Sequence, residues 1–459
     1  MSKLTKVFSM GLTTMIGVTA LVGCGSSEKV DNSTTVTVDF WSAPNQGQYN
    51  YWEEKANAFN ATNTQINGKT IQVKVQQMPE TPSSEAGIQN ALATGTVPAI
   101  SENINRGFAT TLAASDVVYE LQDEEWFKDI IEEKKIEETL KGWEINDKQF
   151  VLPTYVNPMT WQWNVKALET LGISEVPTTV AEFDAVLEAF VANQDKMKEI
   201  GVTHTFYRPS IVRPDQWWDR WHDFQMPYMA LTQKLDWVDG NKLVLDREGA
   251  IEAFEFIGKF GNTIQTGEMS NIWLEDMPQV LVTINAPWDI NILRESGKVY
   301  GTDYIYGPSI VKNEGDTPYN YADAKGLVLY KHNSISEDEH AGAVEFVKWI
   351  YNKENSAQTD LDWLKTTKML PVRGDIVENP VFSDILGEYP ELKDLAEQVP
   401  FSVPCMPHDK MTDIQTALTE KGMVPYIELV KQSEPLNVPE ADAYIDAAFE
   451  AMRQAGGLE

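Results

Sequence analysis

The chain has 459 residues, more than one ordinary domain, and its hydrophobic content of 42% is enough for a sizeable core. Its 69 acidic residues outnumber 37 basic ones, and the resulting net charge of −32 argues against nucleic acid as a partner, because the phosphates would be repelled. Cys24 and Cys405 are the two cysteines of the sequence, so no framework of several disulfides is predicted.

The N-terminal residues have the parts of an export signal. Lys3 and Lys6 form a positive segment, and residues 7–20 are mostly apolar and uncharged. The apolar stretch is too short for a comfortable membrane span. We therefore predict a cleavable signal peptide over residues 1–23, with a transmembrane anchor as the alternative.

Cys24 ends a Leu-Val-Gly-Cys run that resembles the lipobox of bacterial lipoproteins. The resemblance implies a lipid on the Cys24 thiol, a tether over residues 24–33, and anchoring to the extracellular face of the cell membrane. Each buried methylene contributes about 0.8 kcal/mol, so two or three acyl chains anchor a protein firmly. The alternative is an ordinary thiol at this position. With Cys24 lipidated, Cys405 has no intramolecular cysteine partner.

Periodic patterns after the tether predict strands and helices in alternation. Residues 34–40 and 70–76 alternate as strands, and residues 48–60 and 84–94 are amphipathic, as helices are. This order of strand, helix, strand and helix is typical of the start of an α/β lobe with a mostly parallel sheet. Past residue 150 the patterns predict a strand over 159–163 and helices over 180–193, 248–262, 338–351 and 441–453.

Many of the 14 tryptophans stand beside polar or turn residues rather than inside apolar runs. Examples are Trp41, the pair Trp217 and Trp218, and Trp288. Indole rings offer flat apolar faces, and sugars offer flat C–H faces ringed by hydroxyls. The pattern therefore favours a carbohydrate site, while the alternative for each indole is a place in the core.

Six short segments in a fixed order resemble the family 1 extracellular solute-binding proteins of ABC importers, the group that includes maltose-binding protein. The segments are 38–41 (Val-Asp-Phe-Trp), 91–98 (Ala-Leu-Ala-Thr-Gly-Thr-Val-Pro), 151–155 (Val-Leu-Pro-Thr-Tyr), 176–179 (Val-Pro-Thr-Thr), 282–288 (Val-Thr-Ile-Asn-Ala-Pro-Trp) and 369–373 (Met-Leu-Pro-Val-Arg). The chain departs from the family pattern at Ala99, where the family has aspartate after the proline.

The resemblance implies an α/β fold of two lobes, like that of periplasmic binding proteins, with a hinge and an interlobe cleft. The first lobe is expected over 34–151 and 286–332, and a helix-rich second lobe over 152–285 and 333–459. Open α/β sheets bind ligands at the carboxyl ends of their strands, which would line the cleft. Closure of the lobes would bury the ligand and create the surface that the permease recognises.

Candidate ligand contacts are polar and aromatic residues in loops after strands or on the expected crossings between lobes. Those before residue 160 are Trp41, Asn45, Glu80, Asn103, Arg106, Tyr155 and Asn157. Those after it are Trp217, Trp218, Trp288, Asp289, Tyr321, Asp323 and Arg373. The resemblance implies that Trp288 stacks on a sugar ring, beside the carboxylate of Asp289. The alternatives are packing for Trp41, a solvated loop acid for Glu80 and a structural turn residue for Arg373.

No catalytic motif stands out in the sequence. The five histidines lack metal-ligand spacing, and there is no Gly-x-Ser-x-Gly motif or P-loop. We predict no enzyme activity, metal or cofactor, and a monomer that binds a carbohydrate, an oligosaccharide by preference, for an ABC transporter permease. The alternatives are a lipid-anchored glycoside hydrolase, because carboxylate pairs are abundant, and a binding protein for a cationic solute such as a polyamine.

Overall fold

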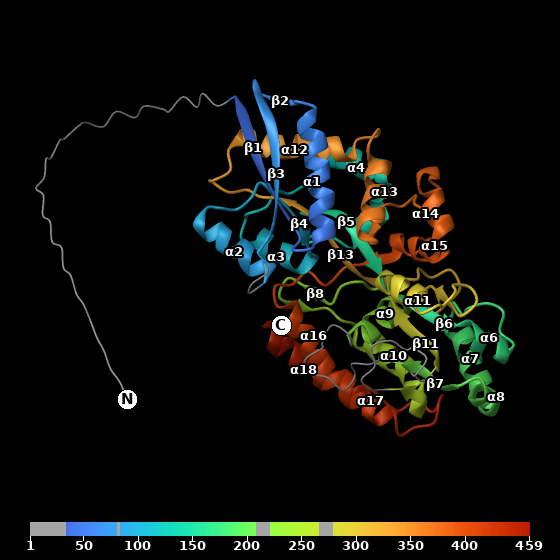
Figure 1. Cartoon of the computed structure of the whole chain (residues 1–459). Coiled ribbons are helices and arrows are strands. Elements are labelled where there is room, and N and C mark those ends of the chain that lie inside the picture. The colour runs from blue at the N-terminus through green and yellow to red at the C-terminus, as the bar shows by residue number, and fades with distance from the viewer. Residues whose placement is uncertain (1–33, 80–82, 208–220, 266–278) are drawn as a thin grey trace, which may run out of the picture.

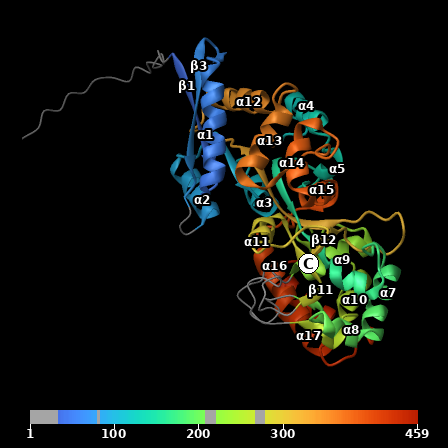
Figure 2. The ribbon, with the colours of Figure 1, turned by 45° about the vertical axis from the view of Figure 1, so that its right-hand side comes forward.

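Each of two lobes is built on its own β-sheet, and the lobes meet where strands cross between them (Figures 1 and 2). The computed structural model describes residues 34–79, 83–207, 221–265 and 279–459. Cys24, Glu80, Trp217 and Trp218 lie outside these ranges. Among the described residues, no helix has both the length and the apolar character needed to cross a membrane.

The first sheet has the strand order β14-β5-β13-β4-β1-β3-β2, with β15 paired to β13. β1 runs parallel to β3 and β4, whereas β13 is antiparallel to β4 and β5. Val36, Val38 and Phe40 alternate into the core of this lobe, as the sequence pattern predicts. The strands are β1 (Thr35–Ser42), β2 (Gln65–Ile66), β3 (Lys69–Gln77), β4 (Ile100–Ile104), β5 (Leu152–Pro158), β13 (Asn320–Leu329), β14 (Leu370–Pro371) and β15 (Ser402–Val403).

Helices from both halves of the chain cover the first sheet. They are α1 (Gln46–Ala61), α2 (Ser84–Thr94), α3 (Arg106–Ala114), α4 (Glu125–Lys134), α5 (Glu137–Lys141), α12 (Glu337–Tyr351), α13 (Ser356–Thr367), α14 (Ser383–Glu388) and α15 (Pro390–Ala396). Gly342 of α12 lies so close to β1 that an added Cβ would meet Val38 Cγ2 at 2.9 Å. The core of the first lobe therefore includes α12 to α15, whereas the expected boundaries placed 333–459 in the second lobe.

The second sheet has the strand order β10-β7-β11-β6-β12. Its strands are β6 (Thr160–Asn164), β7 (Val202–Tyr207), β10 (Ile264–Gln265), β11 (Gln279–Asn285) and β12 (Tyr304–Gly307), and a separate hairpin is formed by β8 (Val238–Asp239) and β9 (Lys242–Leu243). Stacked aromatic rings fill its core, as between Phe206 and Phe260, whose centroids are 4.5 Å apart. β12 pairs with β6 in this sheet, although the expected boundaries put 286–332 in the first lobe.

The helices of the second lobe surround this sheet and include the C-terminus. They are α6 (Val165–Leu171), α7 (Val180–Ala192), α8 (Gln194–Glu199), α9 (Trp221–Thr232), α10 (Arg247–Gly258), α11 (Ile290–Glu295), α16 (Met411–Leu418), α17 (Val424–Val430) and α18 (Asp442–Gly456). A π-helix over Thr419–Met423 joins α16 to α17.

The crossing between lobes is formed by neighbouring strands of the first sheet. β5 ends at Pro158 and β6 of the second sheet begins at Thr160. Between them, the Met159 N–H donates a hydrogen bond of 2.8 Å to the carbonyl of Tyr321 on β13. A second contact lies beside the crossing, where Arg294 of α11 pairs with Glu391 of α15 at 2.6 Å.

Candidate ligand-binding cleft

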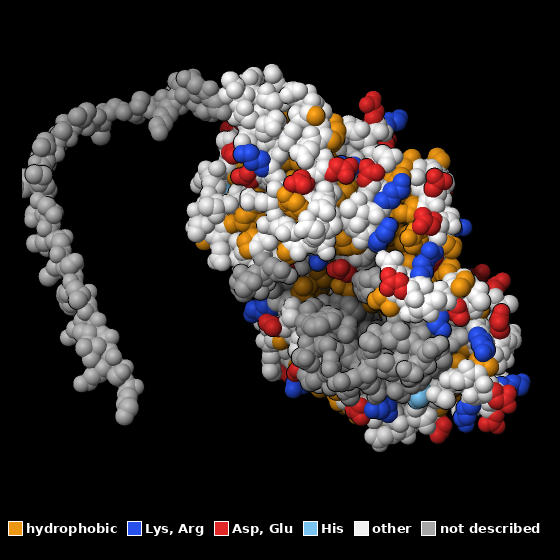
Figure 3. All heavy atoms as spheres, in the orientation of Figure 1, with side chains coloured by type: hydrophobic (Ala, Val, Ile, Leu, Met, Phe, Trp, Pro, Cys, Tyr) orange, Lys and Arg blue, Asp and Glu red, His pale blue; other side chains and the backbone are white. Residues whose placement is uncertain are grey.

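The loops that follow β1 and β4 lie at the same edge of the first sheet. The two strands are parallel neighbours, with Trp41 beside Ser101. Trp41 is half-buried, and Ala43 in the following loop is buried. The molecular surface is hollowed between the two lobes (Figure 3). Such an edge is where open α/β sheets bind ligands, so we take these loops as one wall of the candidate cleft.

Asn103 and Tyr155, both predicted ligand contacts, meet at this edge. The Tyr155 hydroxyl donates a hydrogen bond of 3.0 Å to Asn103 Oδ1. Asn103 has a left-handed backbone with φ of 66°, an arrangement that costs energy outside glycine and often marks functional sites. Tyr155 stacks on Trp363 with ring centroids 5.5 Å apart, and burial raises the pKa of its phenol well above the ordinary value. The phenol therefore stays neutral and acts as a donor.

Asn157 and Asp323 face each other across the ladder between β5 and β13. Directly opposite residues of an antiparallel pair put their side chains on the same face of the sheet. Asn157 is only 4% exposed, and its Oδ1 accepts no hydrogen bond from any described residue. Asp323 is half-buried, and Tyr321, two residues earlier on the same strand, is buried with its pKa raised by burial. The crossing strands thus bring four predicted contacts together next to Asn103.

Arg106 and Asn45 have structural partners instead. Arg106 is buried at the start of α3, where Nε donates to the carbonyl of Glu144 at 2.9 Å. Its Nη1 pairs at 2.9 Å with Asp236, which precedes β8 of the second lobe, so the guanidinium bridges the two lobes. Asn45 Oδ1 caps α1 by accepting from the N–H groups of Gly47 and Gln48 at 2.9 and 3.2 Å.

The turn after β11 carries Trp288 and Asp289. Pro287–Asp289 forms a 3-10 turn that leads into α11. Burial raises the pKa of the Asp289 carboxyl, and a hydrogen bond with the Asn285 side chain opposes this shift. The Asn285 amide in turn donates to Gln162 Oε1 at 3.2 Å. Asp289 is thus a half-buried acceptor next to amide side chains of the second sheet.

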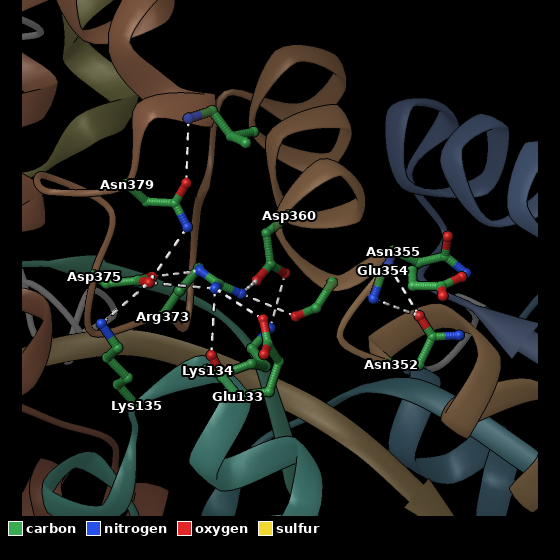
Figure 4. A network of polar contacts seen from close by, with 12 residues as sticks. Glu133, Lys134, Lys135, Asn352, Glu354, Asn355, Asp360, Arg373, Asp375 and Asn379 are labelled. Carbon is green, nitrogen blue, oxygen red and sulfur yellow. Dashed lines mark hydrogen bonds and ion pairs between the residues drawn. The ribbon is translucent and has the colours of Figure 1, made fainter.

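Arg373 lies in a buried ionic cluster of the first lobe and not among the residues of the crossing (Figure 4). Nη1 donates to Ser356 Oγ at 2.9 Å, and Nη2 pairs with Glu133 at 3.3 Å. Asp360 and Asp375 complete the acidic surroundings of the guanidinium. The cluster joins α4 and α13 to the loop after β14, so this side chain fixes helices in place.

Two buried polar residues were not among the predicted site residues. Gln415 on α16 is fully buried, and neither amide atom of its side chain has a hydrogen-bond partner among the described residues. It precedes the Thr419–Met423 π-helix, and π-bulges frequently occur at functional sites. Glu102 on β4 is fully buried beside the β1–α1 loop. The only sequence signal for either residue is a polar side chain next to core positions.

The described residues contain no group of three or more His, Cys, Asp or Glu side chains that could hold a metal ion. The arrangement at the crossing is suited to hydrogen bonding. It offers the Asn157 Oδ1 acceptor, which no described residue occupies, and the Asp323 carboxylate, with the stacked Tyr155 ring nearby. Such a set can recognise a neutral ligand with several hydroxyl groups, because hydroxyls both donate and accept.

A family model of bacterial extracellular solute-binding proteins matches residues 54–393. The solved structure of lmo0859 from Listeria monocytogenes EGD-e is similar at 30% identity, with a TM-score of 0.77 and coverage of 92% of this chain and 98% of that chain. The cyclic alpha-maltosyl-1,6-maltose binding protein from Arthrobacter globiformis has the same fold, with a TM-score of 0.69 at 15% identity, covering 92% and 99%. A Staphylococcus aureus extracellular solute-binding protein, solved in complex with maltose, has a TM-score of 0.64 at 13% identity, covering 91% and 97%. No curated protein sequence matches the chain.

The matched range begins within α1, after β1, and extends over β3, β4 and the crossing strand β5 of the first sheet and over the strands of the second sheet. The similarity to lmo0859 likewise extends over 92% of the chain. The protein therefore belongs to the family of bacterial extracellular solute-binding proteins.

Proposed function

We propose that this solute-binding protein captures a carbohydrate, an oligosaccharide by preference, between its lobes and delivers it to the permease of an ABC importer. The observation that carries the proposal is the buried Oδ1 of Asn157, which has no hydrogen-bond partner in the part of the chain that the structure describes and lies beside the Asp323 carboxylate and the stacked Tyr155 ring. An unsatisfied buried acceptor costs about 1–3 kcal/mol, and a hydroxyl of the ligand would supply the missing donor.

Two further observations support a sugar. The relative from Arthrobacter globiformis is named for binding cyclic alpha-maltosyl-1,6-maltose. The relative from Staphylococcus aureus was solved in complex with maltose. Trp288 and Asp289 are consecutive residues of the turn over Pro287–Asp289, which comes directly after β11. An aromatic ring that covers a sugar face, next to a carboxylate that accepts its hydroxyls, is the arrangement we propose for Trp288.

A thermal-shift screen of the mature protein against glycans tests this function. The correct glycan should raise the melting temperature, because selective binding to the folded state adds RT ln(1 + [L]/Kd), about 2.7 kcal/mol at a hundredfold excess over Kd. The glycan should also remain intact after incubation. Released reducing ends would instead indicate a glycoside hydrolase, and stabilisation by spermidine but by no glycan would indicate a polyamine-binding protein.

We further propose that lipid on Cys24 anchors the protein at the extracellular face of the membrane. The Cys24→Ala variant should be released from membranes, because loss of the thiol removes the attachment point and with it about 0.8 kcal/mol per buried methylene. Fractionation of cells that express either form measures this release. A variant that still sediments with membranes after a high-salt wash would contradict the lipid anchor.

A further inference from the structure

Glu102 accepts hydrogen bonds from the β1–α1 loop, which forms part of one wall of the candidate cleft. Its side chain is fully buried on β4. The Ala43 N–H donates to Glu102 Oε1 at 2.7 Å, and Gln48 Nε2 donates to both carboxylate oxygens at 3.1 Å. One carboxylate thus fixes the backbone of the loop and the first turn of α1 at the same time.

The position of this carboxylate couples the two loops that form one wall of the candidate cleft. Ala43 stands two residues after the candidate contact Trp41 and two before Asn45, which caps α1, so a shift of its backbone moves both residues. Glu102 also directly precedes Asn103, which accepts the hydrogen bond from Tyr155. A change at Glu102 therefore alters the β1–α1 loop through the hydrogen bond to Ala43. It alters the β4–α3 loop through the backbone that joins Glu102 to Asn103.

The surroundings of Glu102 contain one opposite charge and several neutral groups. Lys325 on β13 is the charged side chain that faces it, while Tyr155 on β5 and Tyr351 on α12 are phenols kept neutral by burial. α1 contributes the uncharged side chains of Gln48 and Trp52. Burial raises the pKa of Glu102 from its ordinary 4.5 to about 7, although the N–H donors and Lys325 oppose this shift.

We propose that Glu102 is a positioning residue that fixes the β1–α1 loop in its ligand-binding conformation when ionised and loosens it when protonated, so that solute capture weakens in mildly acidic surroundings. A proton from solvent would occupy one carboxylate oxygen and convert it from an acceptor into a donor. That oxygen would then face the Gln48 amide, which is already a donor. The role of Glu102 depends on the proposed function in one respect, which is the assignment of the β1–α1 loop to the ligand site.

Glu102→Gln imitates the protonated state at every pH, because glutamine has the same size and carries a donor where the second oxygen was. The variant should fold. The raised pKa means that ionised Glu102 costs the folded state stability above about pH 7, and this cost is absent below its ordinary pKa of 4.5. Glu102→Gln removes that cost, so its melting temperature at high pH should be no lower than that of the wild type.

Asp39→Asn is a control on β1. Partial desolvation raises the pKa of Asp39, but its side chain is exposed and the residue lies before Trp41, outside the β1–α1 loop. An effect of removing one negative charge near this sheet should therefore occur in both variants. An effect on the β1–α1 loop should occur only in Glu102→Gln.

The decisive experiment follows the Ala43 amide without ligand, in the full mature chain labelled with 15N-alanine, from about pH 5.5 to about pH 8.5. The Ala43 resonance should titrate with a midpoint near 7 in the wild type and in Asp39→Asn, and its exchange with solvent should be faster in the acidic form after correction for intrinsic rates. In Glu102→Gln the resonance should not titrate. An Ala43 resonance that does not move in the wild type, or that moves equally in Glu102→Gln, would overturn the proposal.

Calorimetric titration with maltose as the probe adds a functional readout. A neutral acceptor forms a hydrogen bond about half as strong as an ionised one, so Kd should be roughly three- to tenfold higher at the acidic end for the wild type. Glu102→Gln should have the weaker Kd at every pH. Failure of maltose to bind at any pH would count against this sugar as the ligand, while the Ala43 titration would still decide the role of Glu102. A pH-independent Kd in the wild type would contradict the coupling to capture.

Discussion

Replacing Lys134 with methionine should lower the free energy of unfolding by about 3–5 kcal/mol, since removal of one partner from a buried ion pair leaves the other charge uncompensated. Lys134 is fully buried at the end of α4, with Nζ 2.8 Å from Asp360 Oδ1. Its ammonium also lies 4.3 Å from the ring centroid of Tyr351. In the variant, Asp360 would keep only the longer contact with Arg373, at 3.6 Å.

The neighbouring residue is a matched control for this substitution. Lys135 has a side chain that is 65% exposed and a contact of 3.6 Å with Asp375, so Lys135→Met should change stability by less than about 1 kcal/mol. Urea denaturation followed by circular dichroism measures both variants. Equal midpoints for the two variants would show that the buried cluster of Figure 4 does not stabilise the first lobe as described.

Replacing Asn157 with leucine should weaken glycan binding by about tenfold to hundredfold without lowering the stability of the unliganded protein. Asn157 is 4% exposed, and its amide oxygen has no hydrogen-bond partner among the described residues. Removal of this oxygen therefore takes away no internal hydrogen bond to that atom. The ligand, in contrast, would lose an acceptor for one hydroxyl. Calorimetric titration and unliganded melting measure the two effects separately.

Asn164→Leu is the control for a buried amide that already has partners. Asn164 is 5% exposed, accepts from the Ala167 N–H at 3.0 Å and donates to the Val280 carbonyl at 3.2 Å. This variant should lose stability by about 1–3 kcal/mol and keep its ligand affinity. If Asn157→Leu loses stability to the same extent and keeps its affinity, then Asn157 is a structural residue outside the site.

Local signals in the sequence were sufficient for the opening strands and helices of the first lobe. The helix predicted over 84–94 has these bounds in the structure, because Ser83 caps its N-terminus and Gly95 ends it with φ of 71°. The alternating pattern of β1 likewise buries Val36, Val38 and Phe40. Each of these signals involves residues that are close together in the chain, so a single sequence is enough to recognise it.

The partners of distant segments could not be predicted in the same way. The apolar face of α12 indicates a buried helix, but only the structure shows that Gly342 packs on Val38 of the first strand, 304 positions earlier in the chain. The arginines illustrate the same difficulty. Arg106 and Arg373 were both predicted as ligand contacts. Their side chains instead pair with Asp236 and Glu133, which are far away in the chain.

Small-angle X-ray scattering of the mature protein tests most directly whether a glycan is captured between the lobes. With the glycan identified by thermal shift at saturation, the radius of gyration of the wild type should fall, because closure brings the two lobes together. Asn157→Leu at the same glycan concentration should keep the radius of the unliganded protein. Calorimetric binding of the glycan to the wild type without any change in the radius of gyration would contradict capture by lobe closure.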